Sequence, residues 1–519
     1  MRLLPEPPTK SKTKHLMNEI KPTLPLKVVV PVLIIYVILS ALGLRFHELG
    51  LEEGQQYLFG RDSASLADLY HNMRYEGHPR LWCILLYGII HYLTADFAAI
   101  QVFHLLITTA TVYIFLRYAP FDRLIKIGLV FGYYFIFEYN LQSRSYALGI
   151  LLLFVTCLLL SHPAKYLPLI GFLLLMMCNT DIFYAFPAIG IYLYLLMDYA
   201  AQRRLLTTPF YLLTAFFLAG LACSLIQAQI PHEDYIVNTS PEKWLSVKNL
   251  STACLALAGG WLPVPQQRAH FWNTFLVNAG GIGAAVRVVL SIFFLLLPGA
   301  LLKNNPRALV FYYCSLFLLL ALLIVTTFSA ARYFGMVVIY FLAAWWIAGN
   351  GTNGGIPVPA LLLASFRGLV LVQLAVGLFA LEQDLTRPFS QAKNAVAWLK
   401  DHRLNDQAMV VNGYIAGPAL STYLGKKLWY LNTGGEGSFC YWRRPYFPIP
   451  PKTLTEEITG SPFLPQLDTF ILLSSKEIDQ HLLQAEPGGF RFNPLQNFSD
   501  GILSTEDCYI YQAIRTVNH

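Results

Sequence analysis

The chain has little charge for its length. Of its 519 residues only 13% are Asp, Glu, Lys or Arg, whereas 55% are hydrophobic. Soluble domains carry roughly a quarter of their residues as charged side chains, so this chain cannot cover a water-facing surface of ordinary size. Its apolar residues also stand in long blocks, such as 28–42, 316–327 and 337–347. These features exclude a secreted or cytosolic enzyme and a disordered chain, and they predict a polytopic membrane protein.

Several common site motifs are also missing. The eight cysteines include no CxxC pair of the kind that zinc and thioredoxin-like sites use. The Gly-rich segment 349–355 lacks the strand, the lysine and the spacing of a phosphate loop. The net charge of +7 comes from basic residues clustered in short loops, which is typical of membrane topology rather than of a nucleic-acid surface. We therefore expect no nucleic-acid partner. Cys440 and Cys508 in the hydrophilic tail are either buried thiols or a disulfide.

The apolar segments predict about eleven membrane-spanning helices. Segment 79–93 is apolar but has only 15 residues, whereas a span needs about 20. If this segment lies along the membrane interface, the basic loops around Arg117, Arg203 and Lys303 fall on the side of the Lys-rich N-terminus, as the positive-inside rule requires. The spans are then expected near residues 28–44, 97–116, 125–139, 147–161, 166–180, 182–198, 209–228, 287–302, 309–327, 334–349 and 366–382.

This topology divides the chain into three parts. Residues 1–27 form a basic cytoplasmic N-terminus, 28–384 a transmembrane domain with extracytoplasmic loops 45–96 and 229–286, and 385–519 an extracytoplasmic domain. Helical and strand periods alternate at short intervals in this tail, which predicts a small α/β domain. Its helices are expected at 391–401 and 416–424, and its strands at 408–411, 427–431 and 468–473.

A pair of acids in the first extracytoplasmic loop is a candidate catalytic site. Glu52 and Glu53 stand at the start of an amphipathic helix, shortly after the first span. Acidic residues at a helix N-terminus can simply be solvated there, because the helix dipole stabilises them. Alternatively, one carboxylate abstracts a proton from an acceptor hydroxyl, amine or amide while its neighbour orients it.

A second candidate group lies before the short segment 79–93. His78 precedes Pro79, with Arg74 and Glu76 just upstream. Backbone N–H groups at a helix N-terminus attract anions, so His78 and Arg74 can bind a phosphate at that position. The alternative is that His78 is an ordinary loop residue.

Two arginines are expected on the side of the membrane that ordinarily lacks positive charge. Arg144 stands between Glu138 and Tyr146 at the end of one span, and Arg332 stands at the end of another. A single arginine there often only extends to the lipid headgroups. Two together can bind a lipid phosphate, because the planar guanidinium fits phosphate oxygens.

These motifs resemble those of bacterial GT-C superfamily glycosyltransferases, relatives of protein O-mannosyltransferases and of the aminoarabinose transferases that modify lipid A. The resemblance is strongest over residues 28–150 and resumes near Arg332-Tyr333 and over 388–432. The motifs that carry it are EEGQQY at 52–57, YEGHP at 75–79, APF at 119–121, EYNLQSRSYAL at 138–148 and PFSQAK at 388–393.

The resemblance implies a transferase that moves a sugar from a polyprenyl-phosphate carrier to a lipid, glycan or protein acceptor, with inversion at the anomeric carbon. It places the reaction at the extracytoplasmic face of a bacterial inner membrane. The first-loop Asp-Glu pair of the family maps onto Glu52 and Glu53, with Glu52 as general base or acceptor-orienting acid. His78 stands where lipid A-modifying relatives have lysine. Some relatives use a divalent metal, but no ligand set is evident in the sequence, so we expect no cofactor and no metal.

Two other classes of function remain open. A polytopic transporter or lipid flippase should show inverted repeats or charged residues at mid-bilayer, and the sequence shows no repeat of fixed period. A catalytically inactive membrane scaffold that presents the tail domain is the second alternative. Assay with a labelled polyprenyl-phosphate sugar distinguishes it from a transferase.

Overall fold

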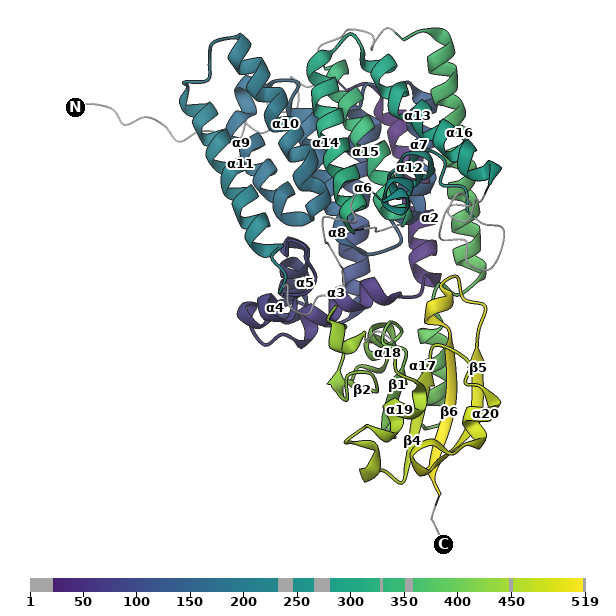
Figure 1. Ribbon diagram of the computed structural model, residues 1–519. Helices are drawn as coiled ribbons and strands as arrows, with labels where there is room; N and C mark the ends of the chain where they lie inside the picture. Colours follow the sequence, from purple (N-terminus) through teal and green to yellow (C-terminus); the bar gives the residue numbers. More distant parts are fainter. Residues whose placement is uncertain are drawn as a thin grey trace, which may run out of the picture.

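A computed structural model shows a bundle of long helices joined to a smaller domain that contains a β-sheet (Figure 1). It describes residues 22–231, 246–265, 281–326, 330–350, 358–447 and 451–516. Most of the basic N-terminus and part of the Gly-rich segment 349–355 lie outside the described residues. The first-loop helices α3, α4 and α5 lie between the bundle and the small domain, at what we call the domain-side end of the bundle (Figure 1).

The helices of the bundle and of its loops follow one another along the first 386 residues. They are α2 (Leu26–Phe46), α3 (Leu51–Asp62), α4 (Leu66–Asn72), α5 (Leu81–Tyr92), α6 (Phe97–Tyr118), α7 (Arg123–Val130), the π-helix η1 (Tyr134–Glu138), α8 (Ser145–Leu159), α9 (Pro163–Thr180), α10 (Ile182–Ala201), α11 (Thr208–Gln227), α12 (Val247–Trp261), α13 (Ile282–Leu302), α14 (Pro306–Thr326), α15 (Ala331–Gly349) and α16 (Ala360–Thr386).

Eight of the described helices are long and apolar enough to cross a membrane. They are α2, α6, α10, α11, α13, α14, α15 and α16. α5 and α8 are apolar but shorter. α5 has 12 residues, so it is about 18 Å long, less than the roughly 30 Å of a bilayer's hydrocarbon core. The chain is an integral membrane protein, and the predicted polytopic helical fold with a small C-terminal α/β part is confirmed.

The surfaces of two helices show how the bundle is layered. Every residue of α15 is buried, which is expected of a helix that is apolar all round and surrounded by other helices. α16 is equally apolar but leaves side chains such as Leu361 and Leu371 exposed, as expected for a face that contacts lipid. α15 therefore forms the centre of the bundle, and α16 lies at its edge (Figure 1).

Two segments of the bundle differ from the sequence expectation. The expected span 125–139 is divided between α7 and the π-helix η1, with a break around Gly132. Loop 229–286 contains an unexpected helix, α12, whose last residue Trp261 stacks on Phe294 of α13 and contacts Phe341 of α15. The stretch in α12 was missed because its apolar run is short and mixed with polar residues at its start.

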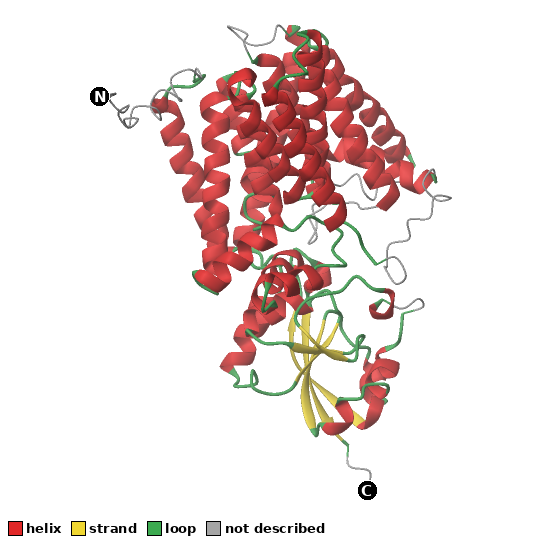
Figure 2. Ribbon diagram, turned by 90° about the vertical axis from the view of Figure 1, so that its left-hand side faces the viewer, coloured by secondary structure: helices red, strands yellow, loops and turns green. Residues whose placement is uncertain are grey.

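The small domain is built on a β-sheet with helices beside it (Figure 2). The sheet has six strands in the order β3-β2-β1-β4-β6-β5. β1 pairs in parallel with both β2 and β4, and the other pairs are antiparallel. The elements are α17 (Ala392–Asp401), β1 (Met409–Asn412), α18 (Gly417–Leu424), β2 (Leu428–Tyr430), β3 (Gly435–Gly437), η4 (Arg444–Tyr446), α19 (Leu454–Thr459), η5 (Leu464–Gln466), β4 (Thr469–Ser474), α20 (Gln480–Gln484), η6 (Pro487–Gly489), β5 (Phe490–Phe498), η7 (Ser504–Glu506) and β6 (Cys508–Arg515).

The expected elements of this tail correspond to α17, β1, α18, β2 and β4, each within about two residues. The terminal hairpin of β5 and β6 was missed, because β5 contains Pro494 and a register shift beside it, features that weaken a strand pattern. Cys440 and Cys508 are both buried free thiols, so the disulfide alternative is wrong.

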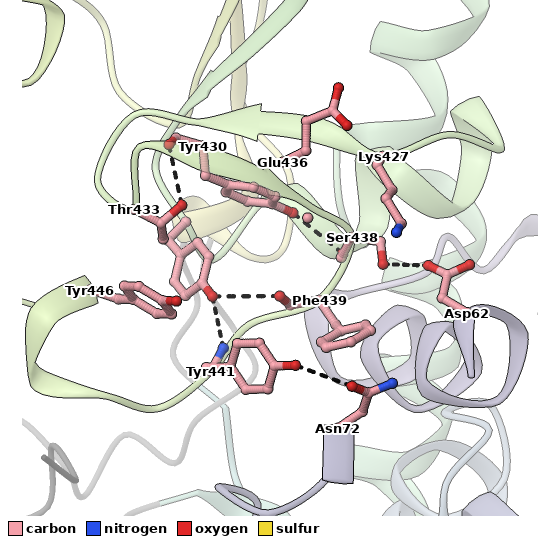
Figure 3. Close-up of a pocket in the computed structure, with 12 residues that line it drawn as sticks. Asp62, Asn72, Lys427, Tyr430, Thr433, Glu436, Ser438, Phe439, Tyr441 and Tyr446 are labelled. Atoms are coloured by element: carbon pink, nitrogen blue, oxygen red, sulfur yellow. Dashed lines mark hydrogen bonds between the residues drawn. The ribbon is translucent and has the colours of Figure 1, made fainter. Parts of the chain in front are cut away.

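The first loop and the small domain are joined by polar contacts around a cavity of about 240 Å³. Ser438 donates to the carboxylate of Asp62 in α3, and the Tyr441 hydroxyl donates to Asn72 of α4 at 3.2 Å (Figure 3). α18 also packs on α3, where a Cβ on Gly54 would lie 3.2 Å from the backbone of Pro418. The domain therefore positions the helix that carries the acid pair.

Candidate active site

The N-terminus of α3 is capped from the small domain. The backbone N–H of Leu51 donates to both carboxylate oxygens of Glu506, at 2.9 and 3.0 Å. This cap satisfies an N–H group that a helix N-terminus otherwise leaves without a partner. Ser390 donates to the carbonyl of Leu49 at 2.6 Å. The acid pair is thus held by contacts from residues more than 300 positions away in the sequence.

Glu52 lies between two arginines. Arg144, directly before α8, binds one oxygen of its carboxylate, and Arg332 at the start of α15 binds the other. The two arginines are 7% and 8% exposed, while the Glu52 side chain is 28% exposed. Three of the residues singled out from the sequence therefore form one cluster, drawn from α3, the residue before α8 and the start of α15.

Aromatic rings hold both guanidinium groups in place. The Arg144 guanidinium lies 4.9 Å from the ring centre of Tyr146, and the Arg332 guanidinium lies 4.6 Å from that of Tyr333. The carbonyl of Arg332 accepts a 2.6 Å hydrogen bond from the Tyr139 hydroxyl. Contacts of a cation with an aromatic face contribute about 0.5–2 kcal/mol each, and Arg332 also donates to the Tyr333 hydroxyl at 3.1 Å.

Glu53 has a different environment from Glu52. It is 3% exposed, and its carboxylate accepts from the backbone N–H of Ser143 at 2.8 Å. Its other oxygen lies 3.1 Å from Nε2 of His47, whose Nδ1 lies 2.9 Å from Asp384. Burial opposes a charged imidazole, but the two carboxylates outweigh it and raise the pKa of His47. Glu53 therefore ties α3 to α2, α16 and the segment that carries Arg144.

Glu76 and His78 belong to two neighbouring polar groups. Glu76 accepts from Gln55 at 2.6 Å and from the indole N–H of Trp442 at 3.0 Å. His78 lies 3.6 Å from the carboxylate of Asp181, which also accepts from Ser145 at 2.9 Å. Burial lowers the pKa of His78, but Asp181 and Glu76 outweigh it and raise the pKa. His78 thus faces a carboxylate that also binds Ser145, the residue directly after Arg144 in the chain.

Glu138 and Arg74 are the remaining candidates from the sequence. Glu138 accepts from the Tyr133 hydroxyl at 2.7 Å, inside the bundle. Arg74 lies over the rings of Tyr75 and Tyr441, at 5.1 and 4.9 Å. The described contacts of Arg74 therefore lie at the joint between α4 and the small domain, whereas Arg144, Arg332 and Tyr146 surround Glu52.

Sequence reasoning missed four residues that build this region: His47, Asp181, Asp384 and Glu506. Asp181 and Asp384 are acids at the ends of apolar segments, where an unpaired charge is costly. That cost was a signal that each has a partner nearby. Glu506 gave no such signal, because it stands in an ordinary hydrophilic stretch of the tail.

A cavity of about 110 Å³ opens beside the acid pair. Its walls combine the start of α3, the turn at Gln142 and three segments of the small domain. It is lined by Gly50, Leu51, Glu52, Glu53, Gln142, Phe389, Ile415, Leu503, Thr505 and Glu506. In the described part of the chain, no three His, Cys, Asp or Glu side chains are grouped so that they could hold a metal ion.

Comparison with known proteins gave one structural similarity. No protein-family model matches the chain, and no curated protein matches it. The chain is similar to the crystal structure of ArnT from Cupriavidus metallidurans bound to undecaprenyl phosphate. The similarity covers 94% of this chain and 98% of the other, with a TM-score of 0.44 and 13% identity.

Proposed function

We propose that this protein is a membrane glycosyltransferase that transfers a sugar from a polyprenyl-phosphate donor to a lipid, glycan or protein acceptor at the extracytoplasmic face of a bacterial inner membrane. Glu52 is the proposed general base, and Arg144 and Arg332 bind the donor phosphate. His78 and Arg74 are further candidates for contact with the phosphate. Glu53 holds the segment that carries Arg144.

The convergence of Arg144 and Arg332 on Glu52 is the observation that carries this proposal. Two largely buried guanidinium groups at one point make a strong binding site for an anion, since each offers a planar set of N–H donors. Arg144 Nε and the Tyr146 hydroxyl are buried with no hydrogen-bond partner among the described residues. Unused buried donors are costly, and the phosphate of a bound donor offers acceptors for them.

The same cluster supports a displacement at the anomeric carbon. A carboxylate has about four acceptor positions, and the two arginines use two of those of Glu52, so it can still take a proton. The acceptor oxygen forms a bond to the anomeric carbon while the bond from that carbon to the phosphate oxygen breaks. The acceptor proton passes to Glu52, and the charge that develops on the departing polyprenyl phosphate is stabilised by Arg144 and Arg332.

Mass spectrometry of lipids that co-purify with the protein tests this proposal. We expect a polyprenyl-phosphate sugar or the polyprenyl phosphate product to be retained by the wild-type protein. Arg144→Gln and Arg332→Gln should each lower the retained amount about tenfold, since each removes a charge-assisted contact of about 1.4 kcal/mol or more.

Arg367→Gln is the matched control. Arg367 also pairs with a carboxylate, that of Asp122 at 2.9 Å, but it lies near the start of α16 and its side chain is 46% exposed. It is 17 positions before Asp384 in the same helix, about 25 Å away. Retention should be unchanged in this variant. Absence of any polyprenyl lipid from the wild-type protein, or equal loss in all three variants, would contradict the proposal.

A further inference from the structure

A large cavity of the small domain lies outside the cluster around Glu52. Its volume is about 820 Å³, enough for a ligand the size of a sugar phosphate or larger. The segments that line it come from the ends of three strands and from two loops. Its lining includes Gly413, Ile415, Arg444, Lys452, Lys476 and Thr505.

The cavity lies where the strand order of the sheet reverses. β2, the next strand in the chain after β1, pairs with one edge of β1, and β4 pairs with the opposite edge. The segments that follow the carboxyl ends of β1, β2 and β4 all contribute to the cavity wall, at 413–415, Asn432 and 475–476. In open sheets with parallel strands, ligands bind at this position, because the loops diverge there and their backbone groups are available.

The two loops at this reversal approach closely. The backbone N–H of Ser475 donates to the carbonyl of Asn412 at 2.9 Å. Gly413 has φ 108°, and a Cβ at this position would lie 2.1 Å from Oγ of Ser475. Only glycine fits both the backbone conformation and the space. The floor of the cavity is thus a fixed feature of the sheet.

The charge at the rim of the cavity is mostly positive. Arg444, Lys452 and Lys476 line it, together with one acid, Glu457. Arg444, Lys452 and Lys476 are all exposed in their side chains. Three cations and one carboxylate at the rim of this cavity favour an anionic ligand, since a low-dielectric wall strengthens their field inside the cleft.

The cavity adjoins the site at Glu52. Ile415 and Thr505 line both this cavity and the smaller one that contains Glu52. Thr505 also precedes Glu506, the residue that caps the N-terminus of α3. A ligand in the large cavity therefore reaches toward Glu52 past a wall of two side chains.

We propose that this cavity binds an anionic group, a phosphate or a carboxylate, of the sugar acceptor, and that the acceptor hydroxyl extends past Ile415 and Thr505 to Glu52. This assignment of the acceptor class rests on the proposed transferase function. It makes the small domain the acceptor-binding part of the protein, while Arg144 and Arg332 bind the donor.

Lysine acetylation measured at each site by mass spectrometry tests anion binding on the full-length protein in detergent. Inorganic phosphate at about ten times its dissociation constant should slow acetylation of Lys452 and Lys476 about tenfold, because the fraction of empty sites falls in that proportion. Lys400, an exposed lysine of α17 outside the cavity, is the internal control and should keep its rate. Sodium chloride of equal ionic strength should leave the acetylation rates of all three lysines unchanged.

Two further arms identify the source of the anion. Protection by vesicles with phosphatidic acid, but not by phosphatidylcholine vesicles, assigns the anion to a lipid headgroup. Protection by inorganic phosphate and glucose 1-phosphate without an effect of the vesicles assigns it to a soluble or glycan phosphate. Either result supports the proposal. Equal protection of Lys400, or no protection of Lys452 and Lys476 by any of these probes, overturns it.

A pair of variants separates this proposal from the proposed transferase function. Arg444→Gln should weaken the protection of Lys452 and Lys476 by phosphate, while Arg491→Gln, a change at an exposed β5 arginine outside the cavity, should not. Both variants should retain polyprenyl lipid as the wild-type protein does. Lost lipid retention in the Arg144 and Arg332 variants reports on the donor site alone, so the failure of one proposal leaves the other measurable.

Discussion

Glu52 and Glu53 are neighbours in one helix, but their surroundings differ in every respect that matters for chemistry. Glu52 is partly exposed beside a cavity, and both of its described partners are cations from other helices. Glu53 is buried, and its partners are the backbone N–H groups of Ser143 and Gly50 and an imidazole that a second carboxylate also holds. A helix turns about 100° per residue, so adjacent side chains project to different sides.

In the proposed transferase, this comparison assigns the reaction to Glu52 and a positioning role to Glu53. A general base must be within reach of a substrate proton and free to accept it. Glu52 is partly exposed at the cavity, whereas the carboxylate of Glu53 is buried and bound to Ser143 and His47. The contact of Glu53 with Ser143 in turn fixes the residue next to Arg144. The predictions that follow test this difference between the two acids.

The largest expected effect is that of Glu52→Gln on turnover. The amide keeps the size of the side chain but cannot take a proton, so the rate of sugar transfer should fall by roughly 10²–10⁴-fold, the usual contribution of general base catalysis. Retention of the polyprenyl donor should persist, because both arginines remain. Transfer of a labelled sugar from a polyprenyl-phosphate donor in proteoliposomes measures the rate.

The fold was largely predictable because lipid imposes simple rules on sequence. Long apolar segments such as α14 and α16 are easy to recognise in the sequence. In lipid every backbone polar group must be hydrogen-bonded within the segment, so such a segment can only be a helix. α12 and η1 were not predictable in this way. Trp261 at the end of α12 packs on Phe294 and Phe341, and a break near Gly132 separates η1 from α7. Tertiary packing rather than local composition therefore determines both helices.

The candidate site was predictable only in part. The unusual position of Arg144 and Arg332 at helix ends indicated an anion, and Glu52 indicated an acid site, but nothing in the sequence showed that all three meet. The roles of Glu506 and Asp384 depend on contacts across more than 330 residues. Such partners follow from the three-dimensional arrangement of helices, which no local pattern encodes.

The second prediction concerns the arginines that hold Glu52. Arg144→Ala removes both charge and hydrogen bonds, so the apparent affinity for the polyprenyl-phosphate sugar should fall about 10–100-fold. Arg144→Lys keeps the charge but loses the planar fork, and its loss should be smaller. The KM for the acceptor should change little in both. Unchanged donor affinity in Arg144→Ala and in Arg332→Ala would mean that both side chains only contact lipid headgroups.

The third prediction concerns Glu53→Gln. The amide oxygen can still accept from Ser143, but it no longer offers a charge to the imidazolium of His47. Stability should fall by about 1–3 kcal/mol, seen as a lower thermal midpoint in detergent, while turnover falls less than in Glu52→Gln. A larger loss of turnover in Glu53→Gln than in Glu52→Gln would exchange the roles of the two acids.

The smallest expected effect on turnover is that of Glu506→Gln, which tests the cap on the helix that both acids share. Burial raises the pKa of Glu506 from its ordinary 4.5 to about 8, and the carboxylates of Glu52 and Glu53 add to the rise against the Leu51 N–H group. The folded protein then holds a proton that the unfolded chain has released. The stability from Glu506 is fully present below pH 4.5 and is lost as pH rises toward 8, with a slope of at most about 1.4 kcal/mol per pH unit.

Glu506→Gln removes this titration and keeps an oxygen for Leu51, so the thermal midpoint of the variant should rise relative to wild type between pH 5 and pH 8. Parallel pH profiles of the two proteins would show that Glu506 does not change its protonation on unfolding.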